Sequence, residues 1–167
     1  SMGGMISQVI AFTIPDRVIK LALVSTGARF HHSPEELREL DEMFTEYSSK
    51  TPALEDWYSE AKYIGDKEFY KPHYAELKKW PSYCWKAAWW GMELQDNTPF
   101  LQYITAPAIA FWGTADPIFT EKYQKEVQKL LPLAKYIFFE DQEHDLMSLV
   151  PDELGRYIKE FFTKPAQ

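Results

Sequence analysis

Three short apolar runs along the chain are the first feature that predicts its fold. They cover residues 18–24, 107–112 and 135–139. Runs of this length, bounded by polar or turn-forming residues, favour buried strands. Apolar residues recur at helical spacing over residues 2–13 and 120–131 and from Pro151 onward. Because strands and helices alternate, we expect an α/β fold with three parallel strands and flanking helices.

The long segment between the first and second apolar runs has a helical pattern throughout. Ser33-Pro34-Glu35-Glu36 is a capping box with proline at the first helical position. Further helices are predicted to begin at Thr51-Pro52, near Tyr74 and at Ser82, with no strand pattern between them. The sequence therefore predicts an α/β core made of residues 1–32 and 99–167, with residues 33–98 inserted as an all-helical cap.

Composition and charge narrow the class of protein. With 167 residues, 46% of them hydrophobic, the chain can bury a core. The net charge of −7 disfavours nucleic acids and anionic membrane surfaces as partners. No apolar run approaches the roughly 18 residues that span a bilayer, and no signal segment is present, so a cytoplasmic location is expected. The single cysteine, Cys84, excludes an intrachain disulfide and a cysteine-only metal site.

The residue types needed for nucleophilic hydrolysis occur along the chain in a characteristic order. Such hydrolysis needs an exposed serine hydroxyl, a base and a carboxylate that orients the base. Ser1 begins the segment Ser1-Met2-Gly3-Gly4, Asp116 follows the second apolar run and His144 follows the third. Because the carboxyl ends of parallel strands meet at one edge, we expect Asp116 and His144 to lie there and to hydrogen-bond. The structural alternatives are a turn at Asp116-Pro117 and a solvated histidine in an acidic loop.

These segments resemble the α/β-hydrolase superfamily, and specifically its group of capped esterases, enol-lactonases and carbon–carbon-bond hydrolases. In that fold the nucleophile lies on a sharp strand-to-helix turn with the pattern Gly-x-Ser-x-Gly, and Ser1 with Gly3 matches its second half. The resemblance covers almost the whole chain outside the predicted cap. It rests on the segments 1–6, 15–18, 21–26, 104–107, 113–116 and 143–145. It implies a truncated α/β-hydrolase, the carboxyl-terminal half beginning at the nucleophile elbow.

The resemblance also implies a reaction and its residues. It implies hydrolysis of small carboxylic esters through an acyl-serine intermediate, with no metal and no organic cofactor. Ser1 is the implied nucleophile, Asp116 the acid and His144 the base, and the backbone N–H of Met2 is the implied oxyanion donor. Ser25, at the end of the first apolar run, is the fallback nucleophile, although a turn-forming role is the preferred interpretation of it.

The sequence departs from the pattern of that family at three places. The glycine before the nucleophile is absent, and so is the upstream region that supplies several strands of the sheet. Glu143 stands where the family usually has a glycine before its histidine. The second oxyanion donor comes from an upstream loop. Because losing one such donor lowers the rate by roughly 10²- to 10³-fold, weak activity is expected.

Tryptophans are concentrated in the predicted cap, which holds five of the six. Cap helices of this kind cover the acyl pocket and exclude water. Trp85 and Trp89, together with Trp112 in the second apolar run, are therefore expected to bind the substrate. The alternative is that these rings only fill the interface between cap and sheet. His31-His32 and His73 are interpreted as loop residues rather than metal ligands.

Two other functions remain open beside hydrolysis by this chain alone. One is a catalytically inactive half-domain, and the other is one piece of a split hydrolase that needs an upstream partner. In the full fold the strand at residues 18–24 has a neighbour that this chain does not supply, and an open strand edge can template pairing. We therefore expect a homo-oligomer, with a dimer built on antiparallel pairing of this strand as its minimal unit.

Overall fold

The computed structural model describes residues 1–43, 67–77 and 79–165. The chain divides into two compact units. One combines Ser1–Phe30 with Asp96–Gln167, and the other is His31–Gln95. The second unit ends slightly before the predicted cap boundary at residue 98 because Asn97 belongs to the first unit. Its backbone N–H donates to the carbonyl of Ala28 at 2.8 Å.

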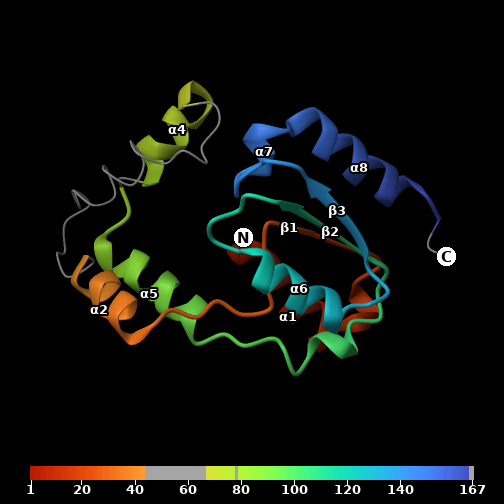
Figure 1. The fold of residues 1–167 in the computed structure, drawn as a ribbon, viewed down its shortest axis with the longest axis horizontal. Helices are drawn as coiled ribbons and strands as arrows, with labels where there is room; N and C mark the ends of the chain where they lie inside the picture. Colours follow the sequence, from red (N-terminus) through yellow and green to blue (C-terminus); the bar gives the residue numbers. More distant parts are fainter. Residues whose placement is uncertain (44–66, 78, 166–167) are drawn as a thin grey trace. The chain divides into compact units, whose positions relative to one another are not determined.

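A three-stranded parallel sheet forms the centre of the first unit, as the sequence predicts (Figure 1). The strands are β1 (Leu21–Val24), β2 (Ala108–Gly113) and β3 (Lys135–Phe139), and they lie in that order across the sheet. Leu21 pairs with Ala108, and Ile109 pairs with Lys135. Because all three strands are parallel, their carboxyl ends lie at the same edge.

Helices cover both faces of this sheet (Figure 1). α1 (Met2–Thr13) and α6 (Glu121–Leu130) share one core with the sheet, and α8 (Pro151–Thr163) packs on the opposite core. The three predicted helices of the α/β core are therefore confirmed. A short additional helix, α7 (Leu146–Leu149), was not predicted, and neither was the 3-10 turn η2 (Leu101–Tyr103).

β2 is buried along its whole length because it is the central strand and both of its faces are covered. Its even-numbered side chains, from Ala108 to Trp112, enter the core beneath α1 and α6. Ile109 and Phe111 enter the core beneath α8. A central parallel strand has no solvent-facing side, so every position is apolar, and this explains the continuous apolar run in the sequence.

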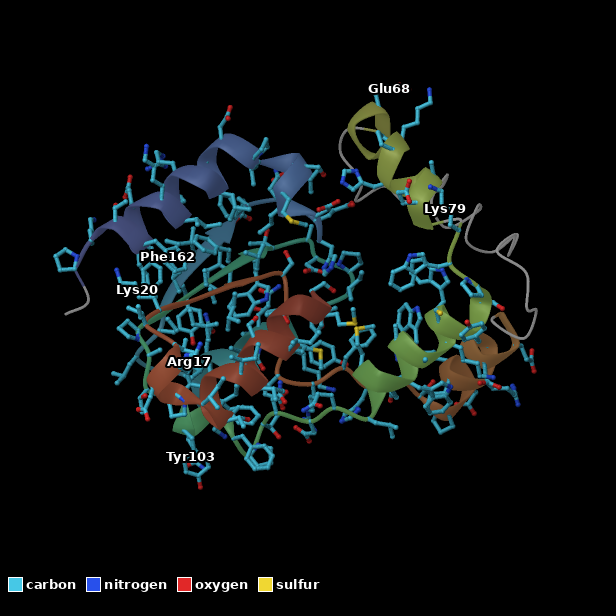
Figure 2. The ribbon with its side chains drawn as sticks, turned by 180° about the vertical axis from the view of Figure 1, so that it is seen from behind. Arg17, Lys20, Glu68, Lys79, Tyr103 and Phe162 are labelled. Carbon is cyan, nitrogen blue, oxygen red and sulfur yellow. The ribbon has the colours of Figure 1, made fainter. Side chains whose placement is uncertain are left out.

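β1 begins three residues later than predicted, at Leu21 rather than Val18. The chain first forms the 3-10 turn η1 (Pro15–Arg17), in which the N–H of Val18 donates to the carbonyl of Pro15 at 3.0 Å. Lys20 then points toward the carboxyl end of α8, and its Nζ donates to the carbonyl of Phe161 at 2.6 Å and to that of Lys164 (Figure 2). Lys20 thus satisfies carbonyls that the end of a helix leaves unpaired.

The described part of the second unit consists of helices: α2 (Pro34–Met43), α4 (Lys67–Leu77) and α5 (Ser82–Glu93). The predicted capping box is confirmed: the N–H of Ser33 donates to Glu36 Oε2 at 2.7 Å, and the N–H of Glu36 donates to Ser33 Oγ at 3.3 Å. The helix predicted from Thr51-Pro52 lies outside the described residues. α4 begins well before the position near Tyr74 that the pattern indicated. None of the described helices combines the length and apolar character required to cross a membrane.

Candidate active site

Asp116 lies in the loop that leaves the carboxyl end of β2. The side chain is buried, and its Oδ1 accepts hydrogen bonds from the backbone N–H groups of Ile118 at 2.8 Å and Phe119 at 3.0 Å. These bonds fix the orientation of the carboxylate, because the loop itself folds around it. The position predicted from the sequence, just past the second strand, is therefore occupied by a fixed acidic group.

His144 follows β3 and faces Asp116 across the same edge of the sheet. Its Nδ1 lies 3.0 Å from Asp116 Oδ2 and 3.1 Å from Oδ1, so the predicted hydrogen bond between the two residues is confirmed. The His144 ring stacks against the ring of Phe119, with 6.0 Å between the centroids. A histidine that donates Nδ1–H to a carboxylate keeps Nε2 as the nitrogen that can accept a proton.

The loops that carry these two residues are joined by backbone hydrogen bonds. The N–H of Thr114 donates to the carbonyl of Phe139 at 3.0 Å, and the N–H of Ala115 donates to that of Gln142 at 2.9 Å. Gly113 makes this approach possible, since a Cβ at this position would lie 2.0 Å from the carbonyl oxygen of Gln142. The sequence places a glycine here because the histidine loop occupies the space of a side chain.

Ser1 lies at the same edge, at the start of α1. Its carbonyl accepts the N–H of Gly4 at 2.8 Å, and its α-amino group donates to the carbonyl of Val24 at the end of β1, also at 2.8 Å. Burial lowers the pKa of this amino group to about 6, and the charges of Asp116 and Asp145 oppose that shift. Ser1 is therefore close to the carboxylates of the site. Within the described part of the chain, Ser1 Oγ makes no hydrogen bond to His144.

The two neighbours of His144 in the chain are acidic, and each has one buried oxygen without a partner among the described residues. These atoms are Glu143 Oε2 and Asp145 Oδ1. Asp145 precedes the first residue of α7, the short helix that begins at Leu146. Buried acceptors of this kind are normally satisfied, so these two oxygens are available to water or to a donor group of a ligand.

Ser25 occupies a strained position between β1 and the site. Its φ is 46°, in the left-handed region that favours glycine, and the residue is only 3% exposed. Its N–H donates to the carbonyl of Phe111 at 2.9 Å, while its hydroxyl is buried without a partner in the described part of the chain. A hydroxyl in this position is inaccessible to an ester, which favours the turn-forming interpretation over that of a fallback nucleophile.

Replacing Ser25 by glycine is expected to stabilise the fold. Glycine removes the left-handed strain and the unpaired hydroxyl, so we expect the free energy of unfolding to rise by about 0.5–1 kcal/mol. Ser25→Val is the opposite control, because a β-branched side chain increases the strain and should lower that free energy by about 1 kcal/mol or more. Urea unfolding measures both changes. A destabilised Ser25→Gly protein would show that the hydroxyl has a role.

Buried amide side chains hold the start of α1 against the sheet, and the sequence analysis missed them. Gln8 Nε2 donates to the carbonyl of Gly27 at 3.0 Å, and Asn97 Nδ2 donates to Gln8 Oε1 and to the carbonyl of Met5, each at 3.0 Å. Both amides are fully buried. One feature of the sequence could have identified Gln8 as buried: it stands three residues after Met5 and three before Ala11, on the inward face of an apolar helix.

The three tryptophans expected to bind substrate lie in different surroundings. Trp112 is fully buried in the core, and its Nε1 donates to the carbonyl of Thr26 at 2.8 Å, so it offers no surface to a ligand in this structure. Trp112 packs there because β2 is the central strand of the sheet. Trp85 and Trp89 belong to α5 in the second unit. Within that unit Trp89 lines a hollow of about 10 Å³, enough for roughly one water molecule.

The adjacent histidines of the second unit share one carboxylate. His32 Nδ1 lies 2.9 Å from Glu93 Oε2, and His31 Nδ1 lies 3.5 Å from Glu93 Oε1. The pair thus joins the beginning of this unit to the end of α5. Among the described residues, no group of histidine, cysteine and acidic side chains is arranged to hold a metal ion.

Solved structures match this chain closely in fold, although no protein-family model and no curated protein matches its sequence. An enol-lactonase from Burkholderia xenovorans superposes with a TM-score of 0.74 at 21% identity, over 98% of this chain and 64% of that one. An α/β-hydrolase enzyme from a Medee basin deep-sea metagenome library gives 0.76 at 20% identity, over 100% and 64%. A thermophilic esterase from Thermogutta terrifontis gives 0.71 at 21% identity, over 97% and 62%.

These alignments agree with the parallel sheet and with its flanking helices. They span nearly all of this chain and less than two thirds of the length of the matched proteins. The chain therefore has the α/β-hydrolase fold, in a partial form that corresponds to about 64% of a full hydrolase chain.

Proposed function

We propose that this chain is a serine hydrolase that cleaves small carboxylic esters through an acyl-serine intermediate. The observation that carries the proposal is the hydrogen bond between His144 Nδ1 and the buried carboxylate of Asp116, at the sheet edge where Ser1 also lies. A histidine oriented by a carboxylate beside a serine is the arrangement that activates a hydroxyl as a nucleophile.

In the proposed reaction His144 acts first as a base and then as an acid. Its Nε2 takes the proton of Ser1 Oγ while that oxygen attacks the carbonyl carbon of the ester. The backbone N–H of Met2 donates to the resulting oxyanion. His144 then gives the proton to the leaving alcohol, which leaves an acyl-serine. A water molecule, deprotonated by His144, attacks the acyl carbon, and His144 then returns the proton to Ser1 Oγ as the bond to the acyl group breaks and the carboxylic acid leaves.

The role of Asp116 in this scheme is to orient and stabilise His144. Because Oδ1 also accepts two backbone N–H groups, the carboxylate cannot rotate away from the ring. It therefore holds the tautomer with the proton on Nδ1 and stabilises the imidazolium that forms during attack. Trp85 and Trp89 lie on α5 of the second unit, and their role in binding the acyl group stays a prediction from the sequence.

Likeness to an enol-lactonase and to an esterase supports ester and lactone carbonyls as the substrate class. Both enzymes are named for acting on the carbonyl of an oxygen ester. Because the chain spans less than two thirds of either protein, its own activity and substrate are part of this proposal.

Hydrolysis of p-nitrophenyl acetate by the purified chain tests the proposal. We expect steady release of p-nitrophenol preceded by a burst of at most one product per chain, because this activated ester acylates the serine faster than the acyl-serine is hydrolysed. His73→Ala is the matched control, since His73 is an exposed histidine of α4 in the other unit. Steady release without any burst, unchanged in Ser1→Ala, would contradict an acyl-enzyme on Ser1.

An alternative function is association of a catalytically weak half-domain with itself or with an upstream hydrolase fragment. The absence of a hydrogen bond between Ser1 Oγ and His144 among the described residues favours it, because a competent nucleophile contacts its base. Ester turnover that appears only after addition of the amino-terminal segment of a related hydrolase would support this alternative.

A further inference from the structure

Phe119 contacts both the acid and the base of the proposed site. Its backbone N–H donates to Asp116 Oδ1 at 3.0 Å. Its ring lies against the His144 ring, with 6.0 Å between the centroids and 28° between the planes. The distance and the angle are those of a stacked pair of rings. One residue therefore joins the loop that carries the carboxylate to the ring that the carboxylate orients.

The hydrogen bond to Asp116 fixes one nitrogen of the His144 ring. Nδ1 lies 3.0 Å from Asp116 Oδ2 and 3.1 Å from Oδ1. A bond at one nitrogen sets a distance, but it leaves the ring able to turn and tilt about the donor. Proton transfer depends on the direction in which Nε2 points. A flat ring packed against one face of the imidazole restricts both movements, so the stack with Phe119 adds what the hydrogen bond lacks.

The Phe119 ring is itself fixed by its neighbours. It is 1% exposed and packs against Phe30, with 5.3 Å between the centroids, and edge-on against Tyr123, with 5.8 Å. Gly27 lies beside it, and a Cβ at that glycine would be 2.7 Å from Phe119 Cδ1. The ring therefore fills the space of a missing side chain. A ring enclosed in this way can act as a rigid support for His144.

A buried amide holds the backbone of Phe119 in place. Gln124 Nε2 donates to the carbonyl of Phe119 at 2.8 Å and to the carbonyl of Gly113 at 3.2 Å. Gln124 is 3% exposed, so these bonds are shielded from water. Gly113 and Phe119 are the two ends of the loop that carries Asp116. One side chain thus ties both ends of that loop together, and the position of Phe119 is coupled to that of the acid.

We propose that Phe119 is a positioning residue, whose ring holds the His144 imidazole in the orientation in which Nδ1 faces Asp116 and Nε2 stays available to the reacting oxygen. The effect on catalysis rests on the proposed function, whereas the effect on the hydrogen bond between His144 and Asp116 does not. The competing interpretation is that Phe119 only fills the core. Removal of its ring would then lower stability and leave the orientation of His144 unchanged.

Kinetics of Phe119→Leu and Phe119→Met with p-nitrophenyl acetate test the effect on catalysis. Both variants remove the flat ring, and methionine conserves most of its volume. We expect kcat to fall on the order of 10- to 100-fold, because a small misplacement of a catalytic group has this effect. KM should change by less than about twofold, since His144 serves both acylation and deacylation. Phe111→Leu is the matched control, because Phe111 is fully buried in the core beneath α8 and should keep kcat.

Nuclear magnetic resonance of chain labelled with ¹⁵N-histidine tests the orientation of His144 without any turnover. The chain has four histidines, and the Nδ1–H signal of His144 is identified by its absence from His144→Ala. Because this proton is bonded to Asp116, we expect it to exchange slowly with water in the wild type. Exchange should be about tenfold faster or more in both Phe119 variants, through local opening of the bond. It should be unchanged in Phe111→Leu, and thermal unfolding checks that each variant is folded.

The two measurements separate failure of this inference from failure of the proposed function. Folded Phe119 variants with the wild-type exchange rate would overturn the inference, and so would a wild type without the slow signal. Equal acceleration in Phe111→Leu would also overturn it, because general loss of stability would explain the result. Fast exchange in the Phe119 variants alone, with turnover unaffected by His144→Ala, would establish the positioning of His144 and contradict the proposed function.

Discussion

Replacing His144 by alanine is expected to lower the turnover of p-nitrophenyl acetate by about 10²- to 10⁴-fold, the usual contribution of a general base. The variant removes the ring that hydrogen-bonds to Asp116, and in the proposed mechanism this ring accepts the proton of Ser1. The fold should persist, because the carboxylate of Asp116 keeps its bonds from the N–H groups of Ile118 and Phe119.

Asp116→Asn tests the same role of His144 without removing its ring. Asparagine retains an oxygen that can accept the same two backbone N–H groups, so the loop should keep its shape. The amide nitrogen then faces His144 Nδ1 and favours the opposite tautomer, which removes the acceptor at Nε2. We expect a loss of turnover comparable to that of His144→Ala, with unchanged circular dichroism. Wild-type rates in either variant would exclude His144 as the base.

Replacing Gly113 by alanine is expected to damage the site through the backbone. The added Cβ would lie 2.0 Å from the carbonyl oxygen of Gln142 and 2.5 Å from that of Glu143, so the histidine loop must move. Overpacking of this kind typically destabilises a protein by about 1–3 kcal/mol. Because His144 follows Glu143 directly, the same displacement should break its hydrogen bond to Asp116 and lower ester turnover.

Gly155→Ala is the matched control for that change. Gly155 lies in α8, and a Cβ there would meet no atom within 4 Å. Alanine in a helix interior is favoured over glycine by about 0.5–1 kcal/mol, so this variant should be slightly more stable and fully active. Urea unfolding and ester turnover measure both effects. A Gly113→Ala protein as stable and active as the wild type would contradict the close packing of the two loops.

The sheet and its helices could be predicted because their signals are local. Continuous apolar runs identified β2 and β3, and Ser33 with Glu36 marked the start of α2. The start of β1 could not be predicted, because Val18 and Ile19 are β-branched yet the chain is still completing the turn begun at Pro15. The pattern of side-chain types does not reveal which backbone N–H and C=O groups are hydrogen-bonded within a preceding turn.

The acid and the histidine of the candidate site could be predicted from the sequence, but the packing contacts that hold their loops in place could not. Asp116 and His144 follow successive strands, so topology alone brings them to one edge. The crowding at Gly113 arises from a loop about 30 residues away in the chain, and no local pattern reveals it. Trp112 was expected to bind the substrate, but the alternation of side chains along β2 directs it into the core.

Labelling with a fluorophosphonate, followed by mass spectrometry of the digested chain, tests the proposed mechanism most directly. The reagent reacts with a serine hydroxyl only when a neighbouring base activates it. The mechanism predicts one label, on Ser1, that is lost in His144→Ala and retained in His73→Ala. The absence of any label, a label on Ser25, or a label on Ser1 that persists without His144 would contradict it.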